Sequence, residues 1–403
     1  MRVLHVVKTS DGAGWAASQA EVLVRLGVEV HVVLPRAEGR TVAAWKNSGA
    51  HLHVADLSLP VRRPLEFSGV ARRIRRLVAE VQPDLIHSHF VTTTLAMRLA
   101  LGKNHSIPRV FQVPGPLHLE HWHTRKPDLL TAGEADYWIG SSHCIAEHYR
   151  RAGVPDERLF LSYYGACVDT RQPSGVLRQR LGLPAEARIV GNINLIYPPK
   201  YFLGERTGLK GHEVLIEALA EVTAKRPDTY GVLIGGTLPG YPQSYEHFLR
   251  AKAANVAGGR VIMPGYFSPG EVAESWPDFD CAVHVPSSEN CGGVVEPLAA
   301  GVPVIAANVG GLPEVVIDSV TGKIIKERSP RVLAESIVQV MSNVEHWRRR
   351  ALVGQSLVKQ MFDIRRTAVE VHSIYNTILH GEPRPEPFDS REFVSATSEL
   401  VMA

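Results

Sequence analysis

The stretch SSENCGGVVEPLAAGVPVIAANVGGLPEVV, residues 287–316, carries the pattern that decides the fold. It places Glu289 and Glu296 on either side of a glycine pair at 292–293, and apolar sequence follows them. The segment before it, CAVHVPS (281–287), has the apolar and β-branched residues of a buried strand. We therefore expect SENCGG to be the loop at the carboxyl end of that strand and GVVEPLAAG to begin a helix.

The same alternation of strands and helices extends over most of the chain. Helical spacing of apolar residues predicts helices at 15–26, 68–81 and 212–224. Short apolar runs predict strands at 3–7, 28–35, 51–56, 84–89, 109–114, 137–142, 188–193, 230–236, 260–266, 281–287 and 303–309. Strands that alternate with helices form parallel sheets. The expected fold class is α/β, with two Rossmann-like parallel-sheet domains that face each other across a ligand-binding cleft.

Breaks in this alternation predict the domain boundaries. We expect an N-terminal domain over residues 1–170, a linker over 171–187 and a C-terminal domain over 188–360. The linker has prolines and glycines and no strand pattern. We expect a helix over 361–380 to cross back to the N-terminal domain and a tail over 381–403 to follow it. The proline-rich, charged stretch HGEPRPEPFDSREF (380–393) is expected to be extended or loosely ordered.

The composition is that of an ordinary soluble protein. Of 403 residues, 45% are hydrophobic and 21% are charged, and the net charge of +3 is too small to indicate a nucleic-acid partner. Cys144, Cys167, Cys281 and Cys291 form no Cys-x-x-Cys pair, so neither a zinc site nor a disulfide framework is indicated. No stretch has the apolar core of a signal peptide or the ~20 apolar residues of a membrane span. A cytoplasmic location is therefore expected.

The loop after the strand at 281–287 has the chemistry of a sugar-nucleotide site. Ligands of parallel sheets bind at the carboxyl ends of strands. Glycines at a helix start expose amides where the helix dipole is positive, which suits a phosphate. Carboxylates accept hydrogen bonds from hydroxyls, so Glu289 and Glu296 are candidates to hold a hexose and a ribose. The candidate diphosphate contacts between them are Asn290, Cys291, Gly292 and Gly293. The alternative is that each glutamate only complements the helix dipole.

These residues, taken in order, resemble the donor site of retaining glycosyltransferases of family 4, the "group 1" set with the GT-B architecture. The resemblance rests on Pro286-Ser287, Glu289, Gly292, Glu296, Gly301-Val302-Pro303-Val304 and Gly310-Gly311-Leu312-Pro313-Glu314. Six residues separate the two glutamates here, where the common family spacing is seven. The Glu-Asn-x-Gly-Gly-x-x-Glu form is similar to a subset of bacterial polysaccharide-type transferases.

The resemblance also implies a cation for the donor diphosphate. GLKGHEVLIEAL (208–219) resembles the family segment whose lysine faces the diphosphate, which implies this role for Lys210. The family has an arginine five residues earlier, where this chain has Glu205, so Arg206 or Lys200 is the candidate replacement. Without the motif, Lys210 would read as a solvated loop lysine. The family needs no metal and no cofactor, and its donor is a nucleotide sugar, with UDP expected here and GDP as the alternative.

A second glycine-rich loop follows the first strand. In DGAGWAAS (11–18), Gly12 and Gly14 match a dinucleotide-binding loop. Such a site also needs an acid at the end of the second strand, where this chain has Leu34, and Glu38 comes only later. NAD is therefore disfavoured, but Gly12 and Gly14 still allow the backbone to approach a phosphate or sugar closely. The alternative is a tight strand-to-helix turn.

The N-terminal half is rich in histidine, and His118 is our candidate among these residues. The family has a histidine near the donor sugar after the strand at 109–114, but Pro114 precedes Gly115 here. His118 is the nearest candidate for that role; the alternative is a loop histidine that contacts acceptor or solvent. The set comprises His87, His89, His118, His121 and His123. The last three lie at odd spacing in an expected loop, without a neighbouring acidic trio, so no metal site is expected.

A basic amphipathic segment, residues 61–81, is the last notable feature. A helix of this kind can lie on an anionic membrane, which would suit a lipid-linked acceptor. A solvated helix face is the alternative. The arginines concerned are Arg62, Arg63, Arg72, Arg73, Arg75 and Arg76.

Taken together, the residues favour a retaining hexosyltransferase that uses a nucleotide-sugar donor in carbohydrate biosynthesis. The catalytic candidates are Lys210, Glu289 and His118. The acceptor is left open among a growing polysaccharide, a lipid-linked sugar and a small natural product. Two other readings stay open: a nucleotide-sugar 2-epimerase of GT-B architecture, and a non-catalytic sugar-nucleotide-binding partner of another transferase.

Overall fold

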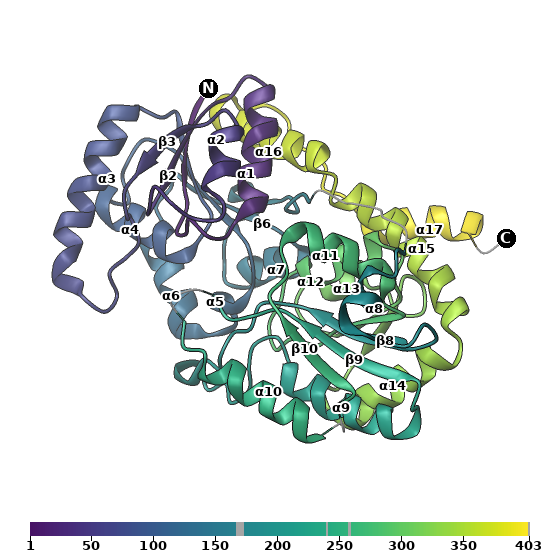
Figure 1. The fold of residues 1–403 in the computed structure, drawn as a ribbon. Coiled ribbons are helices and arrows are strands. Elements are labelled where there is room, and N and C mark those ends of the chain that lie inside the picture. The colour runs from purple at the N-terminus through teal and green to yellow at the C-terminus, as the bar shows by residue number, and fades with distance from the viewer. Residues whose placement is uncertain (167–172, 239–240, 257–258, 402–403) are drawn as a thin grey trace. The chain divides into compact units, whose positions relative to one another are not determined.

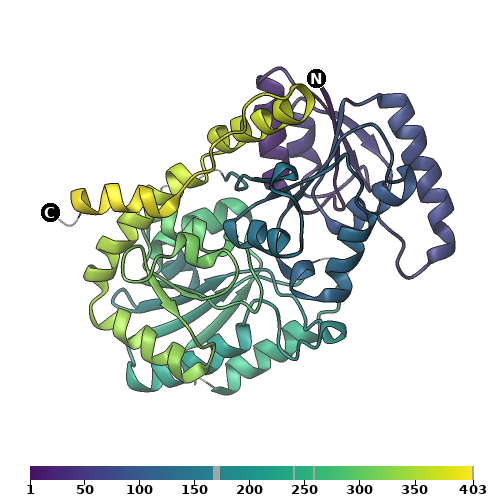
Figure 2. The same cartoon turned by 180° about the vertical axis from the view of Figure 1, so that it is seen from behind.

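The computed structural model describes residues 1–166, 173–238, 241–256 and 259–401. The chain forms two compact units, Met1–Cys167 with Met361–Phe388 and Val168–Gln360 with Asp389–Ala403. Each unit is a parallel sheet with helices on its faces (Figures 1 and 2). The structure does not describe residues 167–172. Cys167, the domain boundary expected at residues 170–171 and the first two residues of the expected linker therefore lie outside the described residues.

The sheet of the first unit has the order β3-β2-β1-β4-β5-β6-β7, and every neighbouring pair is parallel. Two of its inner strands, β4 and β5, are buried along their whole length, as expected for strands of a parallel sheet that is covered on both faces. The strands in the described part of this unit are β1 (Arg2–Val6), β2 (Glu29–Leu34), β3 (His51–Val54), β4 (Leu85–Ser88), β5 (Arg109–Val113), β6 (Asp136–Gly140) and β7 (Leu159–Leu161).

Helices cover both faces of this sheet. Figure 1 shows α1, α2 and α16 on one face of the sheet and α3 and α4 on the other. The core under the first face includes the small residues Ala16, Ala17 and Ala20 of α1 and Tyr375 of α16. The helices are α1 (Gly14–Arg25), α2 (Val42–Asn47), η1 (Pro64–Glu66), α3 (Phe67–Val81), α4 (Val91–Leu101), α5 (Leu117–Glu120), α6 (Trp122–Thr131), α7 (His143–Arg151), η2 (Asp156–Arg158) and α16 (Ile364–His380).

The sheet of the second unit has the order β10-β9-β8-β11-β12-β13, again with parallel neighbours. Its core is packed by α9 and α14 against the central strands. The described strands are β8 (Arg188–Ile193), β9 (Thr229–Ile234), β10 (Val261–Gly265), β11 (Cys281–His284), β12 (Val304–Ala307) and β13 (Lys323–Ile325).

The helices of the second unit connect these strands and continue beyond the sheet. They are α8 (Val176–Leu181), η3 (Tyr201–Leu203), α9 (His212–Lys225), α10 (Ser244–Val256), α11 (Pro269–Ser275), η4 (Trp276–Asp278), α12 (Gly292–Ala299), α13 (Leu312–Val315), α14 (Pro330–Ser342), α15 (Val344–Met361) and α17 (Ser390–Val401).

The predicted fold class is confirmed, since every expected strand is present and both sheets are parallel. The sequence analysis missed β7 and β13, which have only three residues each. The prediction of an extended or loosely ordered segment over 380–393 is wrong for its last four residues, which lie in the first turn of α17 (Ser390–Val401). Asp389 accepts hydrogen bonds from the first amides of this helix, and its Val394 is buried. The expected linker also contains α8.

Candidate active site

The expected donor loop lies where the strand order of the second unit reverses. One branch of the sheet runs outward from β8 and the other from β11. Ligands of open parallel sheets bind outside the carboxyl ends of strands at such a switch point. Lys210 follows β8 in the chain and Glu289 follows β11, so the topology brings the two loops together.

Lys210 and Glu289 form an ion pair between Nζ and Oε2, with side chains 16% and 14% exposed. The backbone N–H of Asn290 donates to Oε1 of Glu289 at 3.1 Å. Burial alone would raise the pKa of Glu289, but the charge of Lys210 and a hydrogen bond from His284 hold the pKa well below its ordinary value. Glu289 is therefore an ionised carboxylate that already carries its partners.

His284 is a site residue that the sequence analysis did not single out. It is the last residue of β11, it is 2% exposed, and its Nε2 lies 3.1 Å from Oε2 of Glu289. Burial lowers its pKa against the opposing effect of Glu289, so the ring is neutral at neutral pH. The only signal in the sequence was a polar residue inside the otherwise apolar run CAVHVP.

The second glycine pair supports the loop that carries Glu289. Gly310 has a φ of +57°, and a Cβ there would lie 1.7 Å from the carbonyl oxygen of Glu289. Only glycine allows both this conformation and this approach. The thiol of Cys291 also lies 3.4 Å from the carbonyl oxygen of Gly311. The loops after β11 and β12 therefore fix each other.

The glycines at the start of α12 have different surroundings. A Cβ on Gly292 would meet nothing within 4 Å, whereas one on Gly293 would lie 2.1 Å from Nε2 of His284. Glu296, one turn further along, is exposed and accepts a hydrogen bond from Nε1 of Trp276 at 3.1 Å. Glu289 is thus half-buried beside Lys210 in the loop before α12, and Glu296 is exposed in the second turn of that helix. Asn290 and Cys291, which lie between them in the sequence, are buried.

The loop that carries Lys210 is anchored just before it. The N–H of Gly208 lies 3.0 Å from Oε1 of Glu213 and 2.9 Å from the hydroxyl of Tyr245, which itself donates to Glu213. Arg206 is exposed and Lys200 half-buried on the preceding part of this loop. The choice between them as a phosphate ligand stays open.

In the first unit, Gly12 and Gly14 lie at the start of α1, with Ala13 between them in the left-handed region at a φ of 62°. A Cβ on Gly14 would meet nothing within 4 Å. Leu34, at the end of β2 where a dinucleotide site needs an acid, is buried. The site roles of both glycines stay predictions.

His118 lies in α5 and faces a buried polar network of the first unit. Its Nε2 is 3.4 Å from Oδ2 of Asp128 and 3.2 Å from the hydroxyl of Tyr149. Asp128 is fully buried and pairs with Arg98 at 2.6 Å. Burial would raise the pKa of Asp128, but His118 and Arg98 hold it far below its ordinary value. His118 therefore has partners inside its own unit, and its expected contact with a donor sugar stays a prediction.

Three buried histidines lie together in the first unit, and the sequence analysis named only two of them. His5 on β1 pairs in register with His87 on β4, and its Nδ1 lies 3.0 Å from Nε2 of His89. Tyr375 and Tyr164 hydrogen-bond to His87 and His89. Burial lowers the pKa of all three rings, that of His5 to about 3. At neutral pH the three rings are therefore neutral side chains of the core.

In the described part of the chain, two groups bring ligand atoms of three side chains within 4.8 Å of one another, as a metal site would need. They are His5, His87 and His89, and Glu29, His31 and His51. The expectation that the protein holds no metal stays a prediction.

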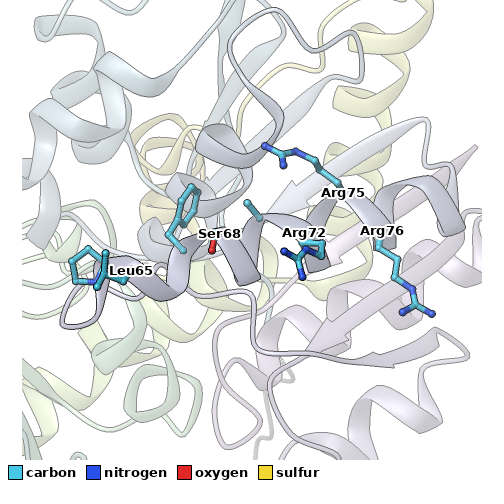
Figure 3. A pocket seen from close by; sticks show the side chains of 8 residues that line it. Leu65, Ser68, Arg72, Arg75 and Arg76 are labelled. Atoms are coloured by element: carbon cyan, nitrogen blue, oxygen red, sulfur yellow. The ribbon is translucent and has the colours of Figure 1, made fainter.

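The basic segment forms η1 and α3. Val70, Ile74 and Leu77 are buried, whereas Leu65 is 94% exposed. An open cavity of 880 Å³ lies over this surface, and Figure 3 shows Arg72, Arg75 and Arg76 of α3 beside it. Its lining comprises Pro64, Leu65, Phe67, Ser68, Ala71, Arg72, Arg75 and Arg76. None of the helices in the described residues has the length and apolar character to cross a membrane.

Two family models match the chain. The model described as "Glycosyl transferases group 1" matches residues 196–352, which include Lys210, Glu289 and Glu296. The model described as "Glycosyltransferase Family 4" matches residues 15–169. Together they cover most of both sheets.

Curated relatives and solved structures agree with these matches. The chain is 30% identical over 213 residues to the D-inositol 3-phosphate glycosyltransferase of Corynebacterium glutamicum, which is 51% of this chain and 47%, about half, of the relative. It is 25% identical over 404 residues to the enzyme of that name from Corynebacterium aurimucosum, covering 90% and 89%. The crystal structure of Anabaena Alr3699/HepE in complex with UDP and glucose has a TM-score of 0.77 at 20% identity, covering 94% of this chain and 100% of that one.

The fold, the two matched domains and the relatives agree with one another. The two parallel-sheet units have the α/β fold of the GT-B class. The match to the family 4 model, followed along the chain by the match to the group 1 model, supports a glycosyltransferase of the group 1 type.

Proposed function

We propose that this glycosyltransferase transfers a hexose from a UDP-sugar to an acceptor hydroxyl with retention of the anomeric configuration. The observation that carries the proposal is the Lys210–Glu289 pair beside the start of α12. A lysine and a helix N-terminus suit a diphosphate, and a carboxylate suits sugar hydroxyls. The similar Anabaena protein was crystallised with UDP and glucose, which makes a UDP-sugar our first candidate donor.

In this proposal the bond between the anomeric carbon and the diphosphate oxygen breaks, and the electron pair leaves with the diphosphate. The acceptor oxygen bonds to the same face of that carbon, and its proton passes to a phosphate oxygen. Lys210 leaves Glu289 to neutralise the diphosphate together with the positive end of α12. Glu289 then holds the hexose and Glu296 the ribose. These groups supply the charge that the leaving group needs, so the proposed reaction requires no metal cofactor.

The acceptor is proposed at the level of chemistry. A sugar, a lipid-linked sugar or a small natural product fits the reaction. Relatives named D-inositol 3-phosphate glycosyltransferase make a phosphorylated polyol one acceptor to test.

The test is to incubate the protein with UDP-glucose, UDP-galactose, UDP-N-acetylglucosamine and GDP-mannose, with and without D-inositol 3-phosphate. Released nucleoside diphosphate is measured, and the product linkage is assigned by NMR. We expect diphosphate release and a retained linkage. Lys210→Ala should lower turnover while the circular dichroism spectrum and thermal midpoint stay near those of the wild type. An inverted linkage would contradict retention, conversion of the donor to its C2 epimer would favour the epimerase reading, and binding without release would favour a non-catalytic partner.

We also propose that the surface of η1 and α3 contacts anionic lipid, because exposed Leu65 stands beside a row of arginines. Co-sedimentation with vesicles of phosphatidylcholine alone and with added phosphatidylglycerol tests this. Binding should require the anionic lipid and should weaken in Arg72→Glu with Arg76→Glu. Equal binding to both vesicles, or to neither, would contradict the proposal.

A further inference from the structure

A buried chain of hydrogen bonds leads to the carboxylate of Glu289 from inside the sheet. The side-chain amide of Asn194, just after β8, lies 3.3 Å from Nδ1 of His284. Nε2 of the same ring lies 3.1 Å from Oε2 of Glu289. His284 is 2% exposed, so water does not compete for either nitrogen. The chain therefore joins the carboxyl ends of the two strands at the switch point.

The chemistry of its members gives this chain a direction. An ionised carboxylate only accepts hydrogen bonds, so Nε2 of His284 carries the proton and donates it to Glu289. In a neutral ring the other nitrogen, Nδ1, is then an acceptor, and the amide of Asn194 donates to it. Asn194 thus selects the tautomer that can hold Glu289.

The ring of His284 is also held sterically. A Cβ on Gly293 would lie 2.1 Å from Nε2 and 2.2 Å from Cε1 of the ring. The imidazole therefore occupies the space that any other residue at position 293 would need. The first turn of α12 closes over the ring, which leaves it no room to swing away from Glu289.

Lys210 and His284 share one oxygen, Oε2 of Glu289. In the proposed reaction Lys210 turns to the diphosphate, so the carboxylate loses that partner when the donor binds. His284 and the N–H of Asn290 are the contacts that remain, on opposite oxygens of the carboxylate.

We propose that His284 is a positioning residue, oriented by Asn194, that holds the carboxylate of Glu289 in place for the hydroxyls of the donor hexose once Lys210 has turned to the diphosphate. The inference rests on the proposed function. It predicts that His284 acts on the sugar part of the donor and not on the nucleotide part.

The experiment compares His284→Leu with His284→Gln in the full chain. Glutamine can present an amide N–H near the position of Nε2, and leucine cannot. The donor used is the one that the wild type consumes among UDP-glucose, UDP-galactose and UDP-N-acetylglucosamine. Calorimetry measures the affinities for UDP and for this donor, and steady-state kinetics give KM and kcat for the donor. His284→Leu should weaken UDP-sugar binding and raise KM about tenfold to a hundredfold, the equivalent of one hydrogen bond to a charged group. UDP affinity should stay within about twofold, and His284→Gln should restore most of the loss.

Asn194→Leu is the second variant, because it leaves His284 in place and removes only the group that selects its tautomer. It should shift the ratio of UDP-sugar to UDP affinity in the same direction by a smaller factor. An unchanged ratio in His284→Leu, or in Asn194→Leu if His284→Leu does not fold, overturns the inference. If the wild type binds UDP and consumes a UDP-sugar and the variants behave like the wild type, the inference is refuted while the proposed function stands. A wild type that consumes none of the donors refutes the proposed function and removes the basis of the inference with it.

Discussion

Two neighbouring glycines at the start of α12 offer a matched pair of substitutions. Neither Gly292 nor Gly293 has a positive φ, so the backbone accepts alanine at both positions. The added methyl group of Gly292→Ala enters open space, whereas that of Gly293→Ala lies 2.1 Å from Nε2 of His284. The two variants therefore differ only in what one carbon atom meets.

The expected magnitudes follow from these contacts. Gly292→Ala should stabilise the protein by about 0.5–1 kcal/mol, since alanine loses less backbone entropy in a helix. Gly293→Ala should destabilise it by about 1–3 kcal/mol, because the His284 ring is enclosed and cannot rotate away. The difference of about 1.5–4 kcal/mol corresponds to about 3–16 °C in thermal midpoint for a unit of this size.

Differential scanning calorimetry of the full chain measures this difference. A third variant, Gly293→Ala combined with His284→Ala, is the control, because removing the ring removes the clash. In the His284→Ala background, Gly293→Ala should no longer destabilise. If Gly293→Ala is as stable as Gly292→Ala, or if its cost persists without the ring, the packing of His284 under α12 is wrong.

Three further predictions concern other parts of the molecule. Glu296→Gln should weaken UDP binding by about tenfold or more, because a charged acceptor for ribose hydroxyls is lost, and calorimetry giving the wild-type affinity would rule out the ribose role. Asp128→Asn should lower the unfolding free energy by about 3–5 kcal/mol, because Arg98 loses a buried counter-charge, and a loss under about 1 kcal/mol in urea titrations would show that the network does not depend on this charge. His5 has a pKa of about 3 in the folded protein against 6.5 ordinarily. As the pH falls, the unfolded state therefore binds a proton at this residue before the folded state does. The contribution of neutral His5 to the unfolding free energy, which is complete well above pH 6.5, should fall by about 2 kcal/mol by pH 5. Urea unfolding at pH 8 and pH 5 should therefore show a smaller acid loss in His5→Gln than in the wild type, and equal losses would refute the assignment.

The sequence predicted the strands and helices that local pattern determines. The strands β1 to β6 and β8 to β12 were recognisable from apolar, β-branched runs between helices. The edge strands β7 (LFL) and β13 (KII) are too short to give a pattern of their own. Helix α17 was missed because the sequence before it is rich in proline, which favours an extended segment. Asp389 caps this helix and Val394 is buried, but both contacts form only when the chain folds, so the sequence pattern does not reveal them.

The loop residues of the candidate site could be named from the sequence, whereas the buried residues that support them could not. Lys210 and Glu289 could be named from motifs, although they are 79 residues apart in the chain. Their contact depends on the sheet order, which places β8 beside β11. His284 lay in a segment interpreted as plain strand, since a single histidine does not reveal which loop residue it will face. His5 was missed for the same reason, because its pairing with His87 is a matter of strand register.

A crystal structure of the protein with UDP tests the central claim most directly. The account predicts the diphosphate within hydrogen-bond distance of Nζ of Lys210 and of the first amides of α12, with Lys210 moved off Glu289 and the ribose at Glu296. A nucleotide bound elsewhere, for example at Gly12 and Gly14, with the Lys210–Glu289 pair still closed, would contradict it.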